Sequence, residues 1–366
     1  MNIQLVTGIF PPDIGGPAHF IPTMQAFLQK SGARVQVLTL AEKSTPQIQS
    51  EFVTRIERKG RFTRFIKVVF KLASKSNGTD IYLASGLYEE TALVLRFKRK
   101  PGIARIVGDP IWERHNNSGG TRIGINEFNE TKLKPGLAFQ RQILRWSLNQ
   151  FSLIVCPSKQ LQQLITGWGV NTEIRVIKNG IPIKKSTLIL AKNANAICAA
   201  RLVRWKNLDK VIEICRELEL ELSILGDGEE LPHLRNLSDT IGAKVYFKGK
   251  QSEIVVQEEL ARHQYFFMLS DYEGQSFALT KAMAEGLFCI VSDIPGNTEI
   301  IKHLENGFVL RLSEFKESVS ELKNLLLSVS EVERIRREAI RTSHESFDEQ
   351  VQLRKLSEIL KSCQKK

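Results

Sequence analysis

Long hydrophobic runs are missing from this chain of 366 residues. No stretch reaches the roughly 18 consecutive apolar residues that a membrane-spanning helix needs, which excludes a protein that crosses the bilayer. The amino terminus, MNIQLVTGIFPP, has no basic segment before its first apolar run, so it is typical of a first strand and not of a signal peptide. We therefore expect a cytoplasmic protein.

Cysteine is scarce as well, with five residues that are widely spaced and odd in number. No Cys-x-x-Cys pair or histidine spacing typical of zinc occurs, so the sequence predicts neither a disulfide framework nor a zinc site. Cys156, Cys198 and Cys289 fall within expected strands, where a free thiol serves as a small buried hydrophobe. This usage fits a reducing compartment.

Acidic residues are depleted in the first half of the chain. The formal net charge is +12, and all of it comes from residues 1–183, where Lys and Arg are about twice as numerous as Asp and Glu. Such asymmetry indicates that the first half meets an acidic partner. A nucleic acid ranks last among the candidates, because no interleaved aromatic stacking motif and no nucleic-acid-binding module are present.

Residues 61–75, RFTRFIKVVFKLASK, combine basic and apolar side chains at helical spacing. The basic set is Arg61, Arg64, Lys67 and Lys71, and the apolar set on a neighbouring face is Phe62, Phe65, Val69 and Leu72. A basic amphipathic helix of this kind fits a peripheral contact with an anionic membrane. A helix that covers a sheet and turns a solvated basic face outward explains the pattern equally well, and the two interpretations are compatible.

The length predicts two domains. Short apolar runs alternate with helical sequence in both halves, which is the pattern of a doubly wound parallel sheet. The turn Asn179-Gly180-Ile181-Pro182 separates an N-terminal domain (1–180) from a C-terminal domain (181–345), with a closing helix in residues 346–366. The expected strands are 3–7, 35–39, 80–84, 103–107, 153–156 and 174–177 in the first domain, and 196–200, 222–225, 245–247, 266–269 and 288–291 in the second.

The most informative stretch lies between two short apolar runs, 265–269 and 287–291, which contain the last two expected strands. A helix over 276–285 connects them, and Gly286 stops it. The preceding loop therefore lies at the carboxyl end of a strand and the amino end of a helix, where free N–H groups favour an anion. Glu273 in this loop would repel phosphate but can accept hydrogen bonds from hydroxyls, and a nucleotide sugar offers both groups. An ordinary turn with a solvated Glu is the alternative.

This stretch resembles the donor-site signature of the retaining GT-B glycosyltransferases of group 1, the family of bacterial phosphatidylinositol mannosyltransferases and sucrose synthases. The matching residues are Glu273, the run Ala282-Met283-Ala284-Glu285-Gly286, and Ser292-Asp293, Gly296 and Glu299. One position departs, because Lys281 stands where the family has a second Glu that grips the ribose hydroxyls. An ammonium donates hydrogen bonds but cannot accept them, so the nucleotide and the sugar stay open.

The resemblance also implies roles for other residues. Arg201 and Lys206 would neutralise the leaving phosphate, one as a two-oxygen clamp and the other as a point charge. The remaining donor-binding set comprises the loop glycines Gly15 and Gly16, then Gly226 and Asp227 near the nucleotide, Lys250 beside the base, the backbone of Gln275, Ser276 and Phe277, and Lys281.

On the acceptor side, Gly108-Asp109-Pro110-Ile111-Trp112-Glu113 follows an expected strand and matches a stretch found in some family members. Asp109 is the catalytic candidate, because a carboxylate at a strand tip can orient sugar hydroxyls or assist the incoming acceptor hydroxyl. Trp112 and Glu113 are weaker acceptor-side candidates. An Asp before Pro that only caps a turn is the alternative.

The implied protein is an α/β enzyme with the GT-B fold, in which two Rossmann-like domains face a central cleft and the closing helix returns to the first domain. It would be a retaining glycosyltransferase of polysaccharide biosynthesis that transfers a sugar from a nucleotide sugar to a hydroxyl of a glycan or lipid-linked acceptor. No Asp-x-Asp stretch is present to hold a divalent metal, and no cofactor is expected. The alternative is a catalytically impaired sugar- or nucleotide-binding subunit of a glycosyltransferase complex, with Lys281 marking the lost turnover.

Overall fold

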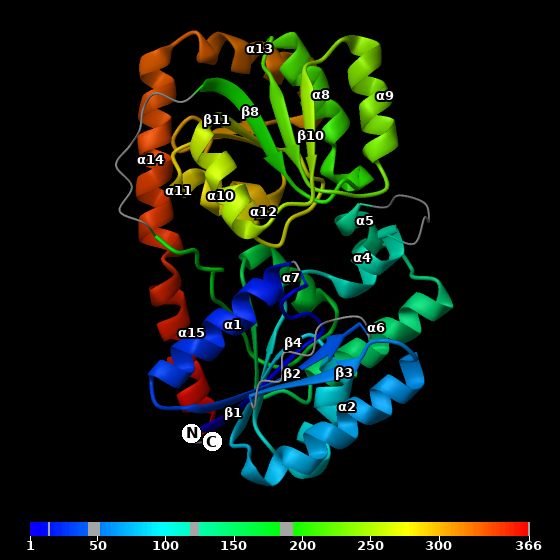
Figure 1. Cartoon of the computed structure of the whole chain (residues 1–366). Helices are drawn as coiled ribbons and strands as arrows, with labels where there is room; N and C mark the ends of the chain where they lie inside the picture. The colour runs from blue at the N-terminus through cyan, green and yellow to red at the C-terminus, as the bar shows by residue number, and fades with distance from the viewer. Residues whose placement is uncertain (14, 43–51, 118–123, 184–192, 365–366) are drawn as a thin grey trace. The chain divides into compact units, whose positions relative to one another are not determined.

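The computed structural model describes residues 1–364 except 14, 43–51, 118–123 and 184–192. It divides into two compact units (Figure 1). The first comprises Met1–Glu113, Phe128–Ile177 and Gln350–Lys366, and the second comprises Arg114–Glu127 and Lys178–Glu349. Within the described part of the chain, no helix is long and apolar enough to cross a membrane.

The first unit contains a sheet with the strand order β3-β2-β1-β4-β5-β6-β7, in which all neighbours are parallel. Strands β1, β4, β5 and β6 are buried along almost their whole length, as expected for a sheet covered on both faces. The strands are β1 (Asn2–Thr7), β2 (Arg34–Ala41), β3 (Val53–Glu57), β4 (Ile81–Ser85), β5 (Gly102–Arg105), β6 (Leu153–Cys156) and β7 (Ile174–Val176).

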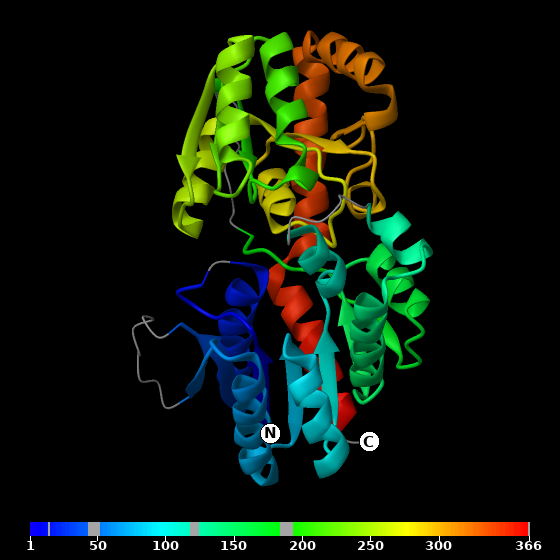
Figure 2. The ribbon, with the colours of Figure 1, turned by 90° about the vertical axis from the view of Figure 1, so that its right-hand side faces the viewer.

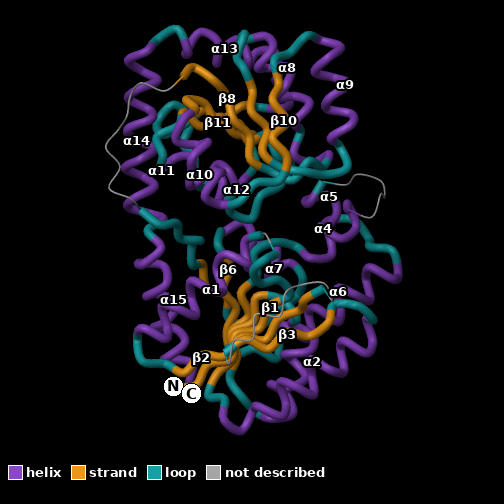
Figure 3. The backbone as a smooth tube through the Cα atoms, viewed as in Figure 1, coloured by secondary structure: helices purple, strands orange, loops and turns teal. Residues whose placement is uncertain are grey.

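Alternation along β4 shows that helices cover both faces of this sheet. Ile81 and Leu83 belong to a buried cluster on one face that also holds residues of α1 and α15. Tyr82, which lies between them, points to the other face, and its hydroxyl donates a hydrogen bond to the Leu72 carbonyl of α2 at 3.4 Å. Figure 3 shows the strands inside and the helices around them.

The second unit contains a parallel sheet with the order β10-β9-β8-β11-β12-β13. One buried cluster includes Val211 and Val319 from helices on one face, and another includes Leu279 and Ala339 from helices on the opposite face. The doubly wound architecture predicted for both halves is therefore confirmed. The strands are β8 (Asn193–Ala199), β9 (Leu222–Leu225), β10 (Val245–Gly249), β11 (His263–Met268), β12 (Phe288–Ser292) and β13 (Phe308–Leu310).

The helices follow the expected alternation with the strands. The predicted helix over residues 61–75 is confirmed with those bounds. The helices are α1 (Gly16–Lys30), α2 (Arg61–Lys75), α3 (Tyr88–Lys98), α4 (Pro110–Asn117), α5 (Ile125–Glu130), α6 (Pro135–Leu148), α7 (Lys159–Gly167), α8 (Leu208–Glu217), α9 (Leu231–Ile241), α10 (Glu253–Arg262), α11 (Phe277–Ala284), α12 (Pro295–Thr298), α13 (Phe315–Leu326), α14 (Val329–Phe347) and α15 (Glu349–Gln364).

The closing helix α15 contributes to the core of the first unit. Leu353, Leu356 and Leu360 pack in the same buried cluster as residues of β1 and α1. Just before this helix, Ile181 donates to the Phe347 carbonyl at 2.7 Å and accepts from the Glu349 N–H at 3.0 Å. The adjacent Gly180 has no room for a side chain, because a Cβ there would lie 2.4 Å from the Glu349 Cα atom.

The three cysteines predicted in strands are buried in β6, β8 and β12, which confirms their assignment as small core residues. Burial raises the pKa of the Cys198 thiol to about 12, against the opposing charge of Lys206. Cys198 is therefore a neutral thiol near neutral pH and not a nucleophile.

Candidate active site

The second sheet has its topological switch point between β8 and β11. From β8 the chain continues through β9 and β10 on one side, and β11 continues through β12 and β13 on the other. In open α/β sheets, ligands bind outside the carboxyl ends of the strands at this point. Lys206 lies in the segment that follows β8, and Glu273 lies in the segment that follows β11. The two segments predicted to bind the donor therefore flank one switch point.

The structure joins Lys206 and Glu273 in an ion pair. The Lys206 Nζ atom donates to Glu273 Oε1 at 2.5 Å, and the Ser270 hydroxyl donates to the same oxygen at 2.8 Å. The two charged side chains are 11% and 12% exposed, so the pair is shielded but can be reached from solvent. No described residue donates a hydrogen bond to Oε2 of Glu273. That second oxygen can accept a hydrogen bond from a ligand.

Arg201 lies on the same segment as Lys206, and the Trp205 ring connects them. The Arg201 guanidinium carbon lies 5.6 Å from the centre of that ring, and the Lys206 Nζ atom lies 4.2 Å from it. Trp205 is buried in a 3-10 turn, whereas Arg201 is exposed. The buried indole thus holds two positive charges close together, an arrangement suited to a diphosphate.

Asn207, which sequence reasoning missed, ties the two segments to each other. Its side-chain amide donates to the Leu269 carbonyl at 2.7 Å and to Asp271 Oδ1 at 2.6 Å. The Asp271 N–H in turn donates to the Trp205 carbonyl at 2.9 Å. Asn207 has a φ of +49°, in the left-handed region that Asn tolerates better than most residues. An Asn directly before a helix was the available signal.

Gly226 and Gly228 bring the loop after β9 against the segment after β8. A Cβ at Gly226, where φ is +146°, would lie 1.8 Å from the Ala200 carbonyl oxygen, and one at Gly228 would lie 2.3 Å from that of Leu202. The predicted Gly226 is thus required by packing. Asp227, which follows β9, and Lys250, which follows β10, are both exposed. Their contacts with a nucleotide stay predictions.

The helix after Glu273 begins as predicted near residue 276. The Ser276 hydroxyl accepts from the Leu279 N–H at 3.3 Å and so satisfies one of the N–H groups at the start of α11, which runs from Phe277 to Ala284. The side chain of Gln275 bonds to the backbone of Asn179: it accepts from the Asn179 N–H at 2.8 Å and donates to the Asn179 carbonyl at 2.9 Å. The positive end of α11 lies on the same loop as the Glu273 carboxylate.

A buried chain of hydrogen bonds supports Glu273 from behind. The Ser292 hydroxyl donates to the Ser270 carbonyl at 2.5 Å, and the Asn297 amide donates to the Ser292 hydroxyl at 3.0 Å. All three residues are fully buried, so they position Glu273 and do not contact a ligand. Ser292 belongs to the motif recognised in the sequence, but nothing in the sequence showed that it bonds to residue 270.

Lys281, where the family has a second Glu, has its own partner in this chain. Its ammonium group forms an ion pair with Glu253 at the start of α10. The Lys281 side chain is largely buried and Glu253 is half exposed. The unusual cation is therefore neutralised within the unit, and a role for Lys281 in donor binding stays a prediction.

The prediction that Asp109 is a catalytic carboxylate is wrong. Its Oδ1 atom accepts from the N–H groups of Ile111 and Trp112 at 2.9 and 3.1 Å, and its Oδ2 atom accepts from Arg141 at 2.7 Å. The carboxylate is fully buried, caps α4 and has no oxygen left for a substrate. Trp112 is also buried and cannot present its ring to an acceptor, which corrects its assignment to the acceptor side. Glu113 is half-buried, and its role stays a prediction.

Gly15 and Gly16 lie in the first unit, at the start of α1. Gly15 has a φ of +150°, and its carbonyl accepts from the His19 N–H at 3.1 Å. They follow β1, and β1 and β4 form the switch point of the first sheet, so the loop lies where a ligand is expected. Their contact with a donor stays a prediction.

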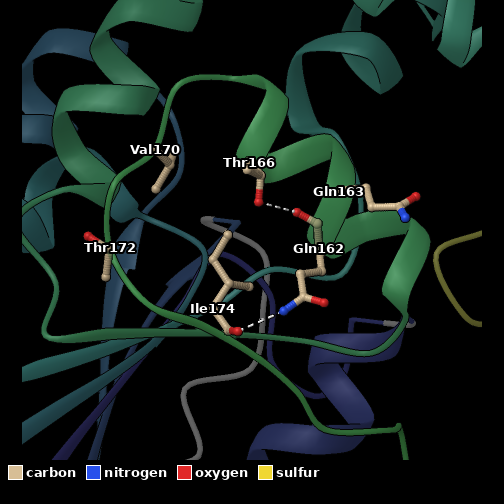
Figure 4. Close-up of a pocket in the computed structure, with 6 residues that line it drawn as sticks. All are labelled: Gln162, Gln163, Thr166, Val170, Thr172 and Ile174. Carbon is tan, nitrogen blue, oxygen red and sulfur yellow. Dashed lines mark hydrogen bonds between the residues drawn. The ribbon is translucent and has the colours of Figure 1, made fainter.

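A pocket in the first unit lies between α7 and β7, and its lining includes none of the residues described above (Figure 4). Thr166 donates to the Gln162 carbonyl at 2.9 Å, and Gln162 donates to the Ile174 carbonyl at 2.8 Å, so its polar groups serve the fold. The lining contains no ionisable side chain: Gln162, Gln163, Thr166, Val170, Thr172 and Ile174. Among the described residues, no group of three or more His, Cys, Asp or Glu could hold a metal ion.

Two family models match the chain, one after the other. The model of glycosyl transferases group 1 matches residues 181–342, which include all the switch-point residues described above. The model of glycosyltransferase family 4 matches residues 14–185. Residues 181–342 belong to the glycosyltransferase group 1 family. The resemblance drawn from Glu273 and the residues after it is confirmed.

Curated relatives agree with this membership, and a solved structure shows the same fold. An N-acetyl-alpha-D-glucosaminyl L-malate synthase of Bacillus anthracis is 26% identical over 175 residues, which are 46% of this chain and 44% of the relative. The alignment thus spans less than half of that relative. An alpha-monoglucosyldiacylglycerol synthase of Streptococcus pneumoniae is 22% identical over 78% of this chain and 70% of its own length. The Anabaena protein HepE, solved with UDP and glucose, has a TM-score of 0.79 at 18% identity, covers 99% of this chain and is itself covered completely, which confirms the GT-B fold.

Proposed function

We propose that the protein is a retaining glycosyltransferase that moves a sugar from a nucleotide sugar to a hydroxyl of a glycan or lipid-linked acceptor. One observation carries the proposal: the Lys206–Glu273 pair lies at the switch point of the second sheet. No described residue donates to Glu273 Oε2, so this oxygen can accept a hydrogen bond from a ligand. A cation for phosphate and a carboxylate oxygen for hydroxyls thus stand side by side.

In this proposal, the second unit carries the donor. Arg201 and Lys206 neutralise the charge that develops on the departing diphosphate, and the positive end of α11 adds to their effect. Glu273 accepts a hydrogen bond from the donor sugar through Oε2 while Lys206 and Ser270 hold Oε1. Because these groups supply positive charge, we propose that transfer needs no divalent metal. Retention is what membership in this family implies.

The donor and the acceptor are narrowed by the relatives alone. HepE was solved with UDP and glucose, so UDP-sugars are the first donors to test. The Streptococcus pneumoniae relative is named for a glycosylated diacylglycerol, which supports a lipid-linked acceptor. A cytoplasmic enzyme at the inner face of the membrane, in contact with anionic lipid through residues 61–75 and active in polysaccharide biosynthesis, fits this proposal.

The test begins with melting curves in the presence of UDP, GDP and ADP, because a ligand that binds only the native state raises the melting temperature. We expect one diphosphate to stabilise the wild type and to have a smaller effect on Lys206→Ala. The matching nucleotide sugar should then be hydrolysed or transferred with EDTA present, and NMR of the product should show the anomeric configuration of the donor. No stabilisation by any diphosphate would overturn the donor site, and an inverted product would overturn retention.

A catalytically impaired binding subunit is the second candidate, and the Lys281–Glu253 ion pair favours it, because it replaces a carboxylate of the family. It predicts stabilisation by a nucleotide diphosphate without hydrolysis of any nucleotide sugar. Turnover by the purified chain alone would exclude it.

A further inference from the structure

Helix α2 exposes a row of large apolar side chains. Phe62, Ile66 and Phe70 follow one another at intervals of four residues and are 76%, 51% and 73% exposed. The side of the helix that packs on the unit is formed by Val68 and Leu72, which are fully buried. The spacing in the sequence predicts Phe62, Phe65, Val69 and Leu72 on a single apolar face. In the structure α2 has an inner and an outer apolar side, and of these four residues only Phe62 lies on the outer side. Three large apolar side chains in solvent exceed what covering the sheet requires.

Helix α6 repeats this arrangement. Phe139, Ile143 and Trp146 are exposed at intervals of four and three residues, which places them on one face of the helix. Leu144 and Leu148 are buried on its inner side.

Helix α3 lies between the two and completes one surface. It packs beside α2 and beside α6, and Figure 2 shows the three helices side by side in the lower part of the view, turned toward the viewer. Phe97, near the end of α3, is 78% exposed. We call the outer side of α2, α3 and α6 the three-helix face.

The three-helix face is strongly basic. Neither α2 nor α6 contains a single Asp or Glu. Exposed cations accompany the apolar residues on each helix: Arg61, Lys67 and Lys71 on α2, Arg96 and Lys98 on α3, and Arg145 on α6. This face also accounts for much of the positive charge concentrated in residues 1–183.

We infer that the three-helix face docks on an anionic lipid bilayer. Aromatic and aliphatic side chains enter the boundary between headgroups and acyl chains, and each nearby Lys or Arg adds about 1 kcal/mol of attraction to an anionic leaflet. A second copy of this chain fits less well, because it would bring the same positive charge to the contact. This inference rests on the membrane contact proposed above for residues 61–75 and extends it to α3 and α6. It does not depend on the proposed transfer reaction, since no residue of the three-helix face belongs to the proposed donor site.

The experiment measures binding of the full chain to vesicles without any nucleotide sugar. Vesicles of phosphatidylcholine alone are compared with vesicles that also contain phosphatidylglycerol, in a flotation assay. We expect the wild type to float with the anionic vesicles only and salt to weaken the binding. The triple variant Phe62→Ser/Phe70→Ser/Phe139→Ser should bind at least about tenfold more weakly, because each substitution removes apolar area from the contact.

Matched controls come from the second unit. Leu327→Ser/Val329→Ser removes two side chains that are as exposed as Phe62, and it should leave vesicle binding unchanged. For charge, Lys67→Glu/Lys71→Glu should abolish binding, whereas Lys316→Glu/Lys323→Glu on α13 makes the same change in net charge and should not. Circular dichroism and the melting temperature verify that every variant is folded.

Three results would overturn the inference. The first is that the wild type does not float with anionic vesicles. The second is that the control variants weaken vesicle binding as much as the variants on the three-helix face do. The third is that the wild type binds no vesicles and light scattering shows a dimer that the triple variant converts to a monomer. Loss of vesicle binding with nucleotide binding retained would separate this surface from the donor site.

Discussion

Asp109 and Glu273 occupy comparable places in the two units. Each is a carboxylate in a loop between a parallel strand and a helix, and each forms an ion pair with a basic residue at 2.5 to 2.7 Å. They differ in the number of carboxylate oxygens that remain available to a ligand. Asp109 uses both oxygens within the protein, whereas Glu273 uses Oε1 alone among its described contacts. One carboxylate serves the fold and the other is available to a ligand.

The difference follows from topology. Glu273 comes after β11, which forms the switch point with β8, while Asp109 comes after β5, one strand away from the β1–β4 switch point of its own sheet. At a switch point the loops after the two adjacent strands lead to opposite sides, which leaves a crevice for a ligand beside the carboxylate. Away from that point, a short Asp before a helix satisfies the helix N–H groups instead. Position in the sheet, not residue type, separates the two roles.

The sharpest test removes the charge of Asp109. Asp109→Asn leaves the buried Arg141 guanidinium without its anion, so we expect the free energy of unfolding to fall by about 3–5 kcal/mol. Urea unfolding measures the loss. Sugar transfer per folded molecule should be unchanged. A stable variant that has lost transfer would return Asp109 to the active site.

The opposite pattern is expected for Glu273→Gln. We expect kcat/KM to fall by at least about 100-fold, a loss of about 2.7 kcal/mol, because the donor sugar loses a charged acceptor. The free energy of unfolding should fall by only about 1 kcal/mol, because the new amide nitrogen can take the position of Oε2, to which no described residue donates, while the amide oxygen still accepts from Lys206 and Ser270. Steady-state kinetics with the nucleotide sugar that the melting curves select measure kcat/KM.

Glu258→Gln provides the control, since it makes the same change on the exposed side of α10 and should leave kcat/KM unaltered. Near-full transfer activity of Glu273→Gln would show that Glu273, like Asp109, is not needed for catalysis.

A smaller effect is expected from Ser270→Ala, which removes one of the two donors that hold Glu273 Oε1. We expect kcat to fall by about tenfold, the value of one hydrogen bond to a charged group, with a smaller change in KM. Ser238→Ala deletes a comparable buried hydroxyl elsewhere in the same unit and should affect stability alone. Equal kinetics in the two variants would show that Ser270 does not position Glu273.

The smallest effect is expected from Lys281→Glu, which introduces the residue of the family. It places two carboxylates together on a half-exposed pair, so we expect a loss of stability below about 1 kcal/mol. The double variant Glu253→Lys/Lys281→Glu should recover that loss, as thermal unfolding can measure. A double variant that is no more stable than Lys281→Glu would show that the ion pair does not contribute to stability.

Much of the fold could be predicted because the strands are buried on both faces. Such strands appear in the sequence as continuous apolar runs, and β6 and β9 have the predicted bounds. Strands β3 and β13 were missed. β3 lies at the edge of its sheet and is mostly half-buried, so its sequence VTRIE carries no apolar run, and β13 has only three residues. The grouping of Arg114–Glu127 with the second unit had no sequence signal either.

The chemistry of the candidate site was less visible. The sequence supplied the charged residues Arg201, Lys206 and Glu273, because their motif has a fixed spacing. It could not show that Lys206 and Glu273 bond to each other, since 67 positions separate them. Asn207 and Asn297 escaped notice for the same reason, and so did the hydrogen bond from Ser292 to residue 270, because a hydrogen bond between distant segments has no period in the sequence.

The amino-acid sequence by itself determined the alternation of strands and helices, the membership in a family and the types of charged side chain at the candidate site, because these follow from local patterns of apolar and polar residues. The tertiary structure alone decided which carboxylate was satisfied within the fold and which kept an oxygen for a ligand. It also decided which apolar residues of α2 and α6 were buried and which remained in solvent. Both outcomes depend on neighbours that are distant along the chain, and only packing brings those neighbours into contact.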